Sequence, residues 1–222
     1  MFRHRRTFWR APACLLLAAT FLLLGSSLAG QTMTPGADPA PTVPQTKTGY
    51  VPITPKQRLM WFVQSTAGVE SLLFAGPFSA GWGTAFHHPK EYNTSWEGFG
   101  QRYGMRLTGV STGNAMEASL GALWGEDPRY FRSTASEPFK KRVGNIVDLT
   151  FRAYRDDGER HFAYARMAGN VGNNFLSNTW RVPSQNDWQS SLIRIAEGVG
   201  AKAVSNAAAE FFPDLLKLIR HR

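Results

Sequence analysis

The sequence predicts a mainly α protein, a compact bundle of about four to five helices rich in glycine and alanine. Three patterns support this fold class. Apolar residues recur at helical spacing over residues 185–219, a segment that is poor strand material. A second helical pattern covers residues 139–154. Earlier in the chain, glycines recur four residues apart, which in a helix produces a flat strip where another backbone approaches closely.

A membrane β-barrel-like fold is the alternative. Alternate positions in the middle of the chain carry Phe99, Gln101, Tyr103, Met105 and Leu107. Alternation of aromatic residues with glycine is common in the strands of outer-membrane barrels. The helical pattern near the C-terminus favours the bundle.

The chain begins with the pattern of a secretory signal peptide, which we place at residues 1–29. Residues 1–13 contain four arginines and no acidic residue, and an apolar run follows over residues 14–24. Ser27 and Ala29 supply the small residues that precede a cleavage site. The run is too short for a comfortable membrane span, although an uncleaved anchor is the alternative. We therefore expect an exported protein of the periplasm or outer envelope.

Two further segments follow the signal peptide. Residues 30–55 contain six prolines and hardly any charge, which predicts a disordered proline-rich leader. Residues 56–222 are expected to form a single, mainly helical domain. The only cysteine, Cys14, lies in the apolar run, so the processed chain has no thiol for a disulfide, a metal site or a nucleophile.

Composition limits the classes of function. A hydrophobic content of 43% and a charged content of 18% are those of a globular or membrane-associated protein. The aromatic content of 13% suits a membrane interface as well as a core. The formal net charge is +9, and removal of the arginines of the signal peptide lowers it to about +5. The remaining basic residues are scattered, so we expect no nucleic-acid partner.

The domain opens with a helix-start signal, Thr54 followed by Pro55. We expect a helix over residues 57–74 that is buried or lies at an interface, followed by a hinge rich in glycine and proline. Because Glu70 is the only charged residue within residues 59–86, a membrane span over that segment is the alternative.

The middle of the chain combines small-residue strips with turns. The glycine pairs are Gly100/Gly104, Gly109/Gly113 and Gly121/Gly125. Asp127 and Arg129 are expected to form an ion pair that fixes a turn. A helix is expected to start after Pro138, and residues 155–160 form a charged turn that lacks the ligand spacing of a calcium loop.

The pattern V-G-x-x-x-[LV]-S-N occurs at residues 171–178 and again at 199–206, and it predicts two helices that pack alike. Five asparagines are expected to form a buried amide network, with a polar ligand site as the alternative: Asn170, Asn173, Asn174, Asn178 and Asn206. Pro213 is expected to kink or end the last helix. Asp214 would then cap a short basic and apolar tail that docks on the core or lies on an anionic membrane.

An envelope hydrolase is the enzymatic alternative, in which His87, His88 or His161 acts with Asp127 or Asp148. No Gly-x-Ser-x-Gly or His-Glu-x-x-His motif occurs in the sequence. Adjacent histidines do not share one face of a helix or strand, so His87 and His88 make a poor chelate. We therefore expect no catalytic residue, no cofactor and no metal site.

Four motifs together resemble those of an uncharacterised family of exported bacterial proteins. They are GFGQRYG at residues 98–104, DPRYF at 127–131, GNVGNNFLSN at 169–178 and EFFPD at 210–214. The resemblance covers residues 85–215. It implies a bacterial envelope setting and supplies no activity.

The sequence therefore favours a non-catalytic exported envelope protein with a membrane-associated or helix-packing structural role. The expected partners are a membrane lipid surface and further copies of the same chain, which would associate through the glycine and alanine strips.

Overall fold

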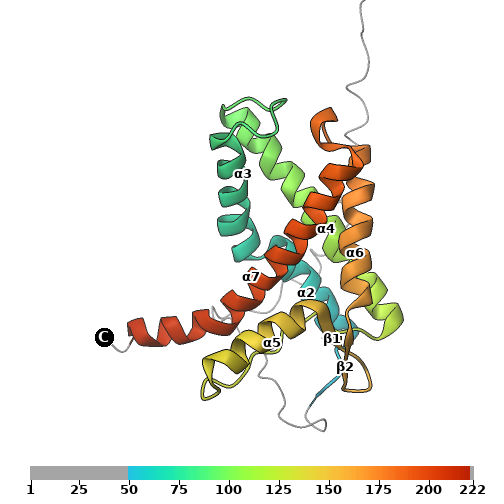
Figure 1. Ribbon diagram of the computed structural model, residues 1–222, viewed down its shortest axis with the longest axis vertical. Helices are drawn as coiled ribbons and strands as arrows, with labels where there is room; N and C mark the ends of the chain where they lie inside the picture. Colours follow the sequence, from blue (N-terminus) through green and yellow to red (C-terminus); the bar gives the residue numbers. More distant parts are fainter. Residues whose placement is uncertain (1–49, 221–222) are drawn as a thin grey trace, which may run out of the picture. The chain divides into compact units, whose positions relative to one another are not determined.

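The computed structural model describes residues 50–220, with side chains as far as residue 215 (Figure 1). The predicted signal peptide and residues 30–49 of the predicted leader lie outside this range, so both remain predictions. All described residues belong to one of the two units into which the chain divides, Pro39–Arg222.

The first described helix, α2 (Pro55–Ala67), begins where the sequence indicates. Thr54 and Gln57 form a capping box, in which each side chain accepts a hydrogen bond from the backbone N–H of the other residue. The helix begins inside the range predicted to be leader. The residues before this helix contact the folded domain from Tyr50 onward. The Tyr50 ring stacks on the ring of Tyr154, with centroids 5.0 Å apart.

The prediction of a helix over residues 57–74 and a following hinge is wrong in its second part. The chain bends at Gly68, continues as the π-helix η3 (Glu70–Ala75), and then forms α3 (Gly76–Ala85) where the hinge was expected. Pro77 lies in the first turn of α3, where a missing N–H carries no penalty. A Cβ on Gly76 would lie 2.5 Å from the Tyr103 ring, so the close approach of α3 to its neighbour requires glycine there.

That neighbour is α4 (Trp96–Trp124), which the Ser95 side chain caps and which ends at Gly125 with a left-handed φ of 68°. The predicted glycine strip is only partly used in packing. A Cβ on Gly169 of α6 would lie 3.3 Å from the carbonyl oxygen of Gly113, which shows close helix contact there. Gly100 and Gly104 face open space instead.

A short hairpin follows α5 (Phe139–Phe151). Strands β1 (Arg152–Tyr154) and β2 (Arg160–Phe162) pair antiparallel, with Ala153 opposite His161. Tyr154, which was assigned to the preceding helix from its spacing, lies in β1. Its carbonyl oxygen accepts a hydrogen bond from the backbone N–H of Asp127 at 2.8 Å, which holds the strand against the turn after α4.

The C-terminal half consists of α6 (Tyr164–Leu176), two single-turn 3-10 helices, η4 (Ser177–Thr179) and η5 (Pro183–Gln185), and α7 (Trp188–Arg220). Asp187 caps α7 by accepting hydrogen bonds from the N–H and hydroxyl of Ser190. Pro213 was expected to kink or end the helix; it does not end it, and the prediction that Asp214 caps a tail is wrong. Pro213 lies inside α7, and Asp214 instead forms ion pairs with arginines of other elements.

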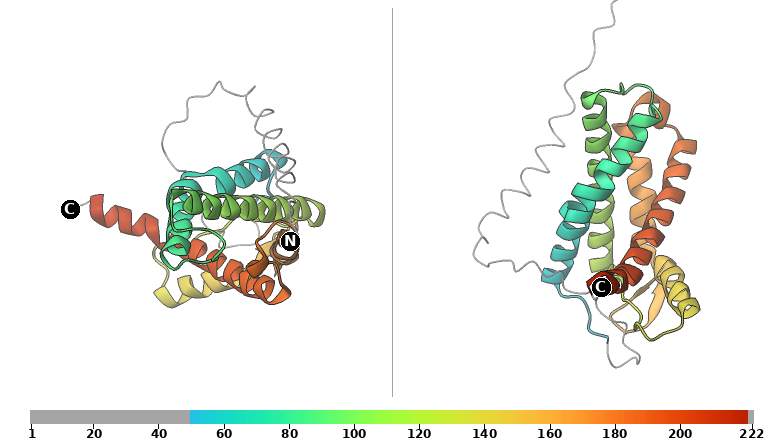
Figure 2. Two further views of the ribbon diagram at one scale, coloured as in Figure 1. Left: turned by 90° about the horizontal axis from the view of Figure 1, so that it is seen from above. Right: turned by 90° about the vertical axis from the view of Figure 1, so that its left-hand side faces the viewer.

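The helices pack as a bundle in which α4 contacts α2, α3 and α6, while α7 contacts α5 and α6 (Figures 1 and 2). This arrangement confirms the predicted mainly helical class, and the only strands among residues 50–220 are β1 and β2. The apolar core is small: Phe131, Leu149 and Tyr154 form its centre, with Tyr50 and Tyr130 packed against it.

Polar and charged side chains occupy much of the remaining interior, while many large apolar side chains are exposed. The buried polar set includes Arg102, Glu126, Asp127, Arg142, Arg166, Asn174, Asn206 and Glu210. Because a buried charge is tolerated only when it is paired and hydrogen-bonded, the partners of these groups decide what the interior can do.

Candidate functional site

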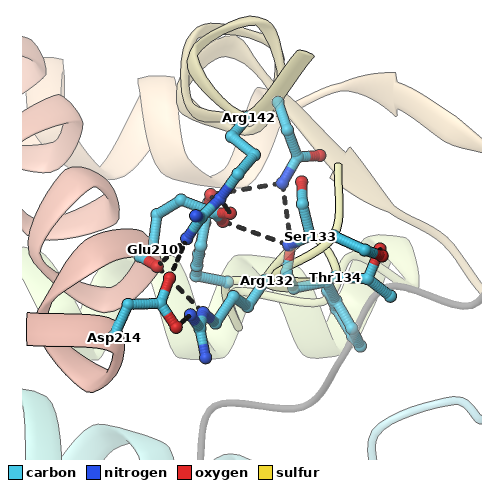
Figure 3. Close-up of polar contacts among 10 residues, drawn as sticks. Arg132, Ser133, Thr134, Arg142, Glu210 and Asp214 are labelled. Atoms are coloured by element: carbon cyan, nitrogen blue, oxygen red, sulfur yellow. Dashed lines mark hydrogen bonds and ion pairs between the residues drawn. The ribbon is translucent and has the colours of Figure 1, made fainter. Parts of the chain in front are cut away.

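The most extensive buried polar cluster centres on Glu210 of α7, whose side chain is fully buried (Figure 3). Its Oε1 accepts a hydrogen bond from Nε of Arg142 at 2.8 Å. Its Oε2 accepts one from the Tyr130 hydroxyl at 2.6 Å and another from the Ser133 backbone N–H at 3.1 Å. The Glu210 carboxylate therefore joins α7 to α5 and to the loop that precedes α5.

Asp214 lies one helical turn after Glu210 and extends the cluster. Its Oδ2 accepts from Nη2 of Arg142 at 2.6 Å, and its Oδ1 forms an ion pair with Arg132. These arginines also donate to the backbone carbonyl of Glu210, Arg132 at 2.8 Å and Arg142 at 2.6 Å. Two carboxylates and two guanidinium groups thus form one network.

The pKa values of the cluster favour its charged form. Hydrogen bonds from Arg132 and Arg142 lower the pKa of Asp214. Burial alone would lower the pKa of Arg142, but hydrogen bonds to Glu210 and Asp214 raise it. Burial and the hydrogen bond to Glu210 raise the pKa of Tyr130, so its phenol stays protonated as a donor. The carboxylates are engaged by donors and stabilise the fold, which leaves no free base for catalysis within the cluster.

A cavity of about 270 Å³, which we call the α5 cavity, lies beside this cluster. Its lining residues are Ser133, Thr134, Glu137, Lys141, Gly144, Asn145, Asp148 and Arg160. The lining side chains include charges of both signs in pairs: Lys141 with Glu137 at 3.2 Å, and Arg160 with Asp148 at 2.8 Å.

Asp127 was expected to pair with Arg129, and it does. Asp127 is fully buried, and Nη2 of Arg129 lies 2.6 Å from its Oδ2. The Tyr50 hydroxyl donates to the same carboxylate at 3.1 Å, and burial together with Asp127 raises the pKa of Tyr50. The carboxylate thus fixes a turn and ties down the segment before α2.

The three histidines of the hydrolase alternative do not come together with Asp127 or Asp148 in any contact among the described residues. His161 instead lies 2.8 Å from Asp157 across the exposed turn of the hairpin. His87 adopts a left-handed φ of 49°, and Nε2 of His88 lies 3.1 Å from the side-chain amide of Gln185. Over residues 50–220, no group of three or more histidine, cysteine, aspartate or glutamate residues is placed to hold a metal ion.

Part of the predicted amide network exists, between α6, η4 and α7, and it includes arginine; the buried side-chain oxygen of Asn173 has no hydrogen-bond partner among the described residues. Asn174 donates to the carbonyl and to the side-chain oxygen of Asn170, at 2.9 Å each. Arg194 of α7 donates to the side-chain oxygen of Asn178 at 2.6 Å and to that of Asn174 at 3.3 Å. Asn206 lies apart from this network and donates to Thr150 at 3.2 Å.

Buried arginines are the polar residues that the sequence reasoning missed. Arg102 donates to the backbone carbonyls of four residues in the loop before α4: His88, Pro89, Tyr92 and Asn93. Arg166 pairs with Glu117 at 2.9 Å and donates to carbonyls at the end of α5. The available signal was the position of Arg102 and Arg166 on helices whose other interior residues are small.

A line of exposed aromatic residues, which we call the aromatic row, runs from η3 along the outer face of α3 to the residue after it. The row consists of Phe74, Phe78, Trp82 and Phe86, spaced four apart and 67%, 72%, 59% and 64% exposed. Ring centroids lie 6.1 Å apart for Phe78 and Trp82 and 4.6 Å apart for Trp82 and Phe86. The opposite face of α3 is small and buried and packs on α4.

Among the helices of the described residues, none is both long and apolar enough to cross a membrane. Comparisons with models of protein families, with curated proteins and with solved structures find no match to this chain. The assignment of function therefore depends on the chemistry of the surfaces and clusters described above.

Proposed function

We propose that this chain is a non-catalytic protein of the bacterial cell envelope, exported to the periplasm or outer envelope, which binds a membrane lipid surface through the aromatic row. The observation that carries the proposal is the orientation of α3. Its small face packs against α4, and its aromatic face remains exposed.

The composition around the row favours lipid as the partner. No aspartate, glutamate, lysine or arginine occurs within residues 71–89, so no charged residue interrupts the row, and Glu70 and Lys90 mark its two ends. Phenylalanine and tryptophan gain free energy at the boundary between lipid headgroups and acyl chains, where a helix can lie in the plane of the surface. Leu59 and Val63 of the preceding helix α2 are also exposed.

Flotation with phosphatidylcholine vesicles tests the proposal on exported, processed protein. The wild type is expected to float with the vesicles, and Phe78→Ser/Trp82→Ser is expected to lose at least tenfold in partitioning because two large apolar side chains leave the interface. Leu123→Ser/Val204→Ser is the matched control, since these side chains are 78% and 70% exposed on other helices. Equal loss in both double variants would contradict the assignment to α3.

Sedimentation velocity without lipid separates membrane binding from self-association. We expect the wild type and Phe78→Ser/Trp82→Ser to sediment alike. A wild-type dimer that dissociates in this variant would replace the lipid with a second copy as the partner of the row. A dimer that depends on Gly100 and Gly104 would assign self-association to the glycine strip.

Export is tested by the N-terminus of the mature protein. Mass spectrometry of the protein recovered from the cell envelope is expected to give a chain that starts near Gly30. A chain that starts at Met1 and fractionates with cytosolic proteins would overturn the proposed location.

The hydrolase alternative has one supporting contact, between His161 and Asp157. A hydrolase of this kind needs a nucleophile or metal next to the base; the side-chain hydrogen bond of His161 goes to Asp157, and no group placed to hold a metal occurs among residues 50–220. Hydrolysis of envelope material by the wild type that is lost in His87→Ala/His161→Ala would favour this alternative over the proposed function.

A further inference from the structure

We propose that the α5 cavity is a binding site for a neutral saccharide. The proposal is independent of membrane binding, because the cavity is lined by the loop before α5, by α5 and by β2, whereas the aromatic row lies on η3, α3 and the residue after it. It is argued from the charge balance of the wall, from its fixed hydrogen-bonding groups and from the glycine in it.

The charges of the wall favour a neutral ligand. Each cation is paired with a carboxylate, Lys141 with Glu137 and Arg160 with Asp148. An anion would meet both carboxylates, and a cation would meet both basic groups. A polyhydroxylated ring suits such a wall, because each hydroxyl can donate to a carboxylate and accept from an ammonium or guanidinium group.

The wall also offers an acceptor whose orientation is set in advance. The side-chain nitrogen of Asn145 donates to the Tyr130 hydroxyl at 3.2 Å and to the carbonyl of Phe131 at 2.9 Å. The amide oxygen Oδ1 of Asn145 therefore remains as an acceptor at the cavity. Since Tyr130 is bound to buried Glu210, the cluster of Figure 3 holds this part of the wall rigid.

Ser133 is fixed by the same cluster. Its backbone N–H donates to Glu210, and among the described residues its hydroxyl has no hydrogen-bond partner. This hydroxyl can donate and accept, which matches the two-way hydrogen bonding of a sugar hydroxyl.

Gly144 lines the cavity and, having no side chain, leaves its volume unfilled. It lies inside α5, is exposed, and has no atom within 4 Å of the position that a Cβ would occupy. Glycine disfavours a helix relative to alanine, and no packing contact here requires it. A larger side chain at residue 144 would project into the cavity. The volume is close to the lower limit of about 300 Å³ for small-molecule pockets and suits one or two sugar rings.

Saturation-transfer difference NMR on the exported, processed chain tests the site with cellobiose, maltose and N,N′-diacetylchitobiose as probes. At least one of these neutral disaccharides is expected to bind. Gly144→Leu is expected to weaken that binding at least tenfold by filling the cavity. Gly200→Leu is the matched control, because Gly200 is also an exposed helical glycine with no atom within 4 Å of its Cβ position.

Ser133→Ala is a second variant that keeps the backbone bond to Glu210 and removes only the hydroxyl; it is expected to weaken binding severalfold. Circular dichroism checks that each variant is folded. The proposal is overturned if none of the three disaccharides binds, or if binding survives both Gly144→Leu and Ser133→Ala. Binding of inorganic phosphate in place of the disaccharides would also overturn it, since an anion contradicts the charge balance of the wall. Binding of glycine alone would overturn it as well, because a zwitterion would use the paired charges and not the hydroxyl-binding groups.

Discussion

Single arginines hold several loops of this protein in place, and the chemistry of the guanidinium group explains why. It carries five N–H donors in a planar fork and stays charged at all relevant pH values. Arg102 uses these donors on four backbone carbonyls, which closes the loop before α4 without a regular secondary structure. Such a role depends on where the carbonyls lie in space, so neither spacing nor composition reveals it.

Lys202 of α7 is a cation whose amine has far fewer hydrogen-bond partners than these arginines. Its amine is 3.5 Å from the carbonyl of Pro128 and lies near the Glu117–Arg166 pair. Burial, and then the charge of Arg166, lower the pKa of Lys202 to about 8. Below this pH, the folded protein must hold a charged amine in an environment that disfavours it.

The free energy of unfolding is therefore expected to rise with pH because of Lys202. Between about pH 8 and pH 10.5 the folded amine is neutral while the unfolded amine remains protonated. The unfolded state therefore binds more protons, and its free energy relative to the folded state rises with pH. Relative to Lys202→Met, the free energy of unfolding of the wild type should rise by about 1–3 kcal/mol between pH 7 and pH 10.5. Solvent reaches part of Lys202, which reduces the effect of burial on its charge.

Urea denaturation of both proteins at pH 7 and pH 10.5, followed by circular dichroism, gives this difference. The comparison with Lys202→Met cancels the titration of the groups that both chains share. A difference in free energy of unfolding that stays constant with pH would contradict the lowered pKa.

At the scale of elements, periodicity was sufficient for most helices. The patterns over residues 139–154 and 185–219 extend over several turns, and α5 and α7 form within three residues of those bounds. The hairpin was not predictable in this way, because each strand has three residues and is held by distant partners such as the N–H of Asp127. Helix α3 was missed because two of its glycines, Gly76 and Gly83, serve contact with α4, which a sequence pattern cannot separate from flexibility.

In the candidate site, contacts between residues close in sequence were predictable, and contacts between distant residues were not. The Asp127–Arg129 pair is local in sequence and was predicted. The pairing of Arg142 with Glu210 joins residues 68 positions apart, and no spacing rule predicts which helices bring such residues together. Glycine spacing likewise predicted a strip without indicating which part of it another helix contacts.

Two glycine substitutions separate the packed part of the strips from the open part. Gly104→Ala in α4 is expected to raise the free energy of unfolding by about 1 kcal/mol, because Gly104 faces open space and alanine is the better helix former. Gly169→Ala in α6 is expected to lower it by about 1–3 kcal/mol, because the new Cβ would lie 3.1 Å from the backbone nitrogen of Glu117 and would push α4 and α6 apart.

Thermal and urea denaturation of both variants measures these effects against the wild type. The expected signs are opposite for the same chemical change, so a general effect of alanine on helix stability cannot produce both. Stabilisation by Gly169→Ala would show that α4 and α6 can separate without cost.

For the whole molecule, the four motifs that suggested a family resemblance have a common physical role: each contributes polar contacts that join distant parts of the chain. The motif at residues 127–131 supplies Tyr130, and the motif at 210–214 supplies Glu210 and Asp214, which meet in one cluster. A protein with a small apolar core and exposed apolar helices must obtain much of its specificity from such internal pairs.

Removal of one charge from this cluster is therefore expected to destabilise the whole fold. Glu210→Gln leaves Nε of Arg142 beside an uncharged amide in a buried position while Asp214 still pairs with Nη2, which should cost about 1–3 kcal/mol out of a typical total of about 5–15 kcal/mol. The matched control is Glu137→Gln, since Glu137 pairs with Lys141 at the surface and should cost less than about 1 kcal/mol.

A double variant decides whether the charges themselves stabilise the protein or only require one another. Arg142→Met/Glu210→Leu replaces the central pair by apolar side chains, and it is expected to cost much less than the sum of Arg142→Met and Glu210→Leu, because neither charge is left without its partner. The residual cost should come from Tyr130, the Ser133 N–H and Asp214, which lose partners in this variant. Costs that simply add, measured by urea denaturation, would show that Arg142 and Glu210 contribute to stability independently.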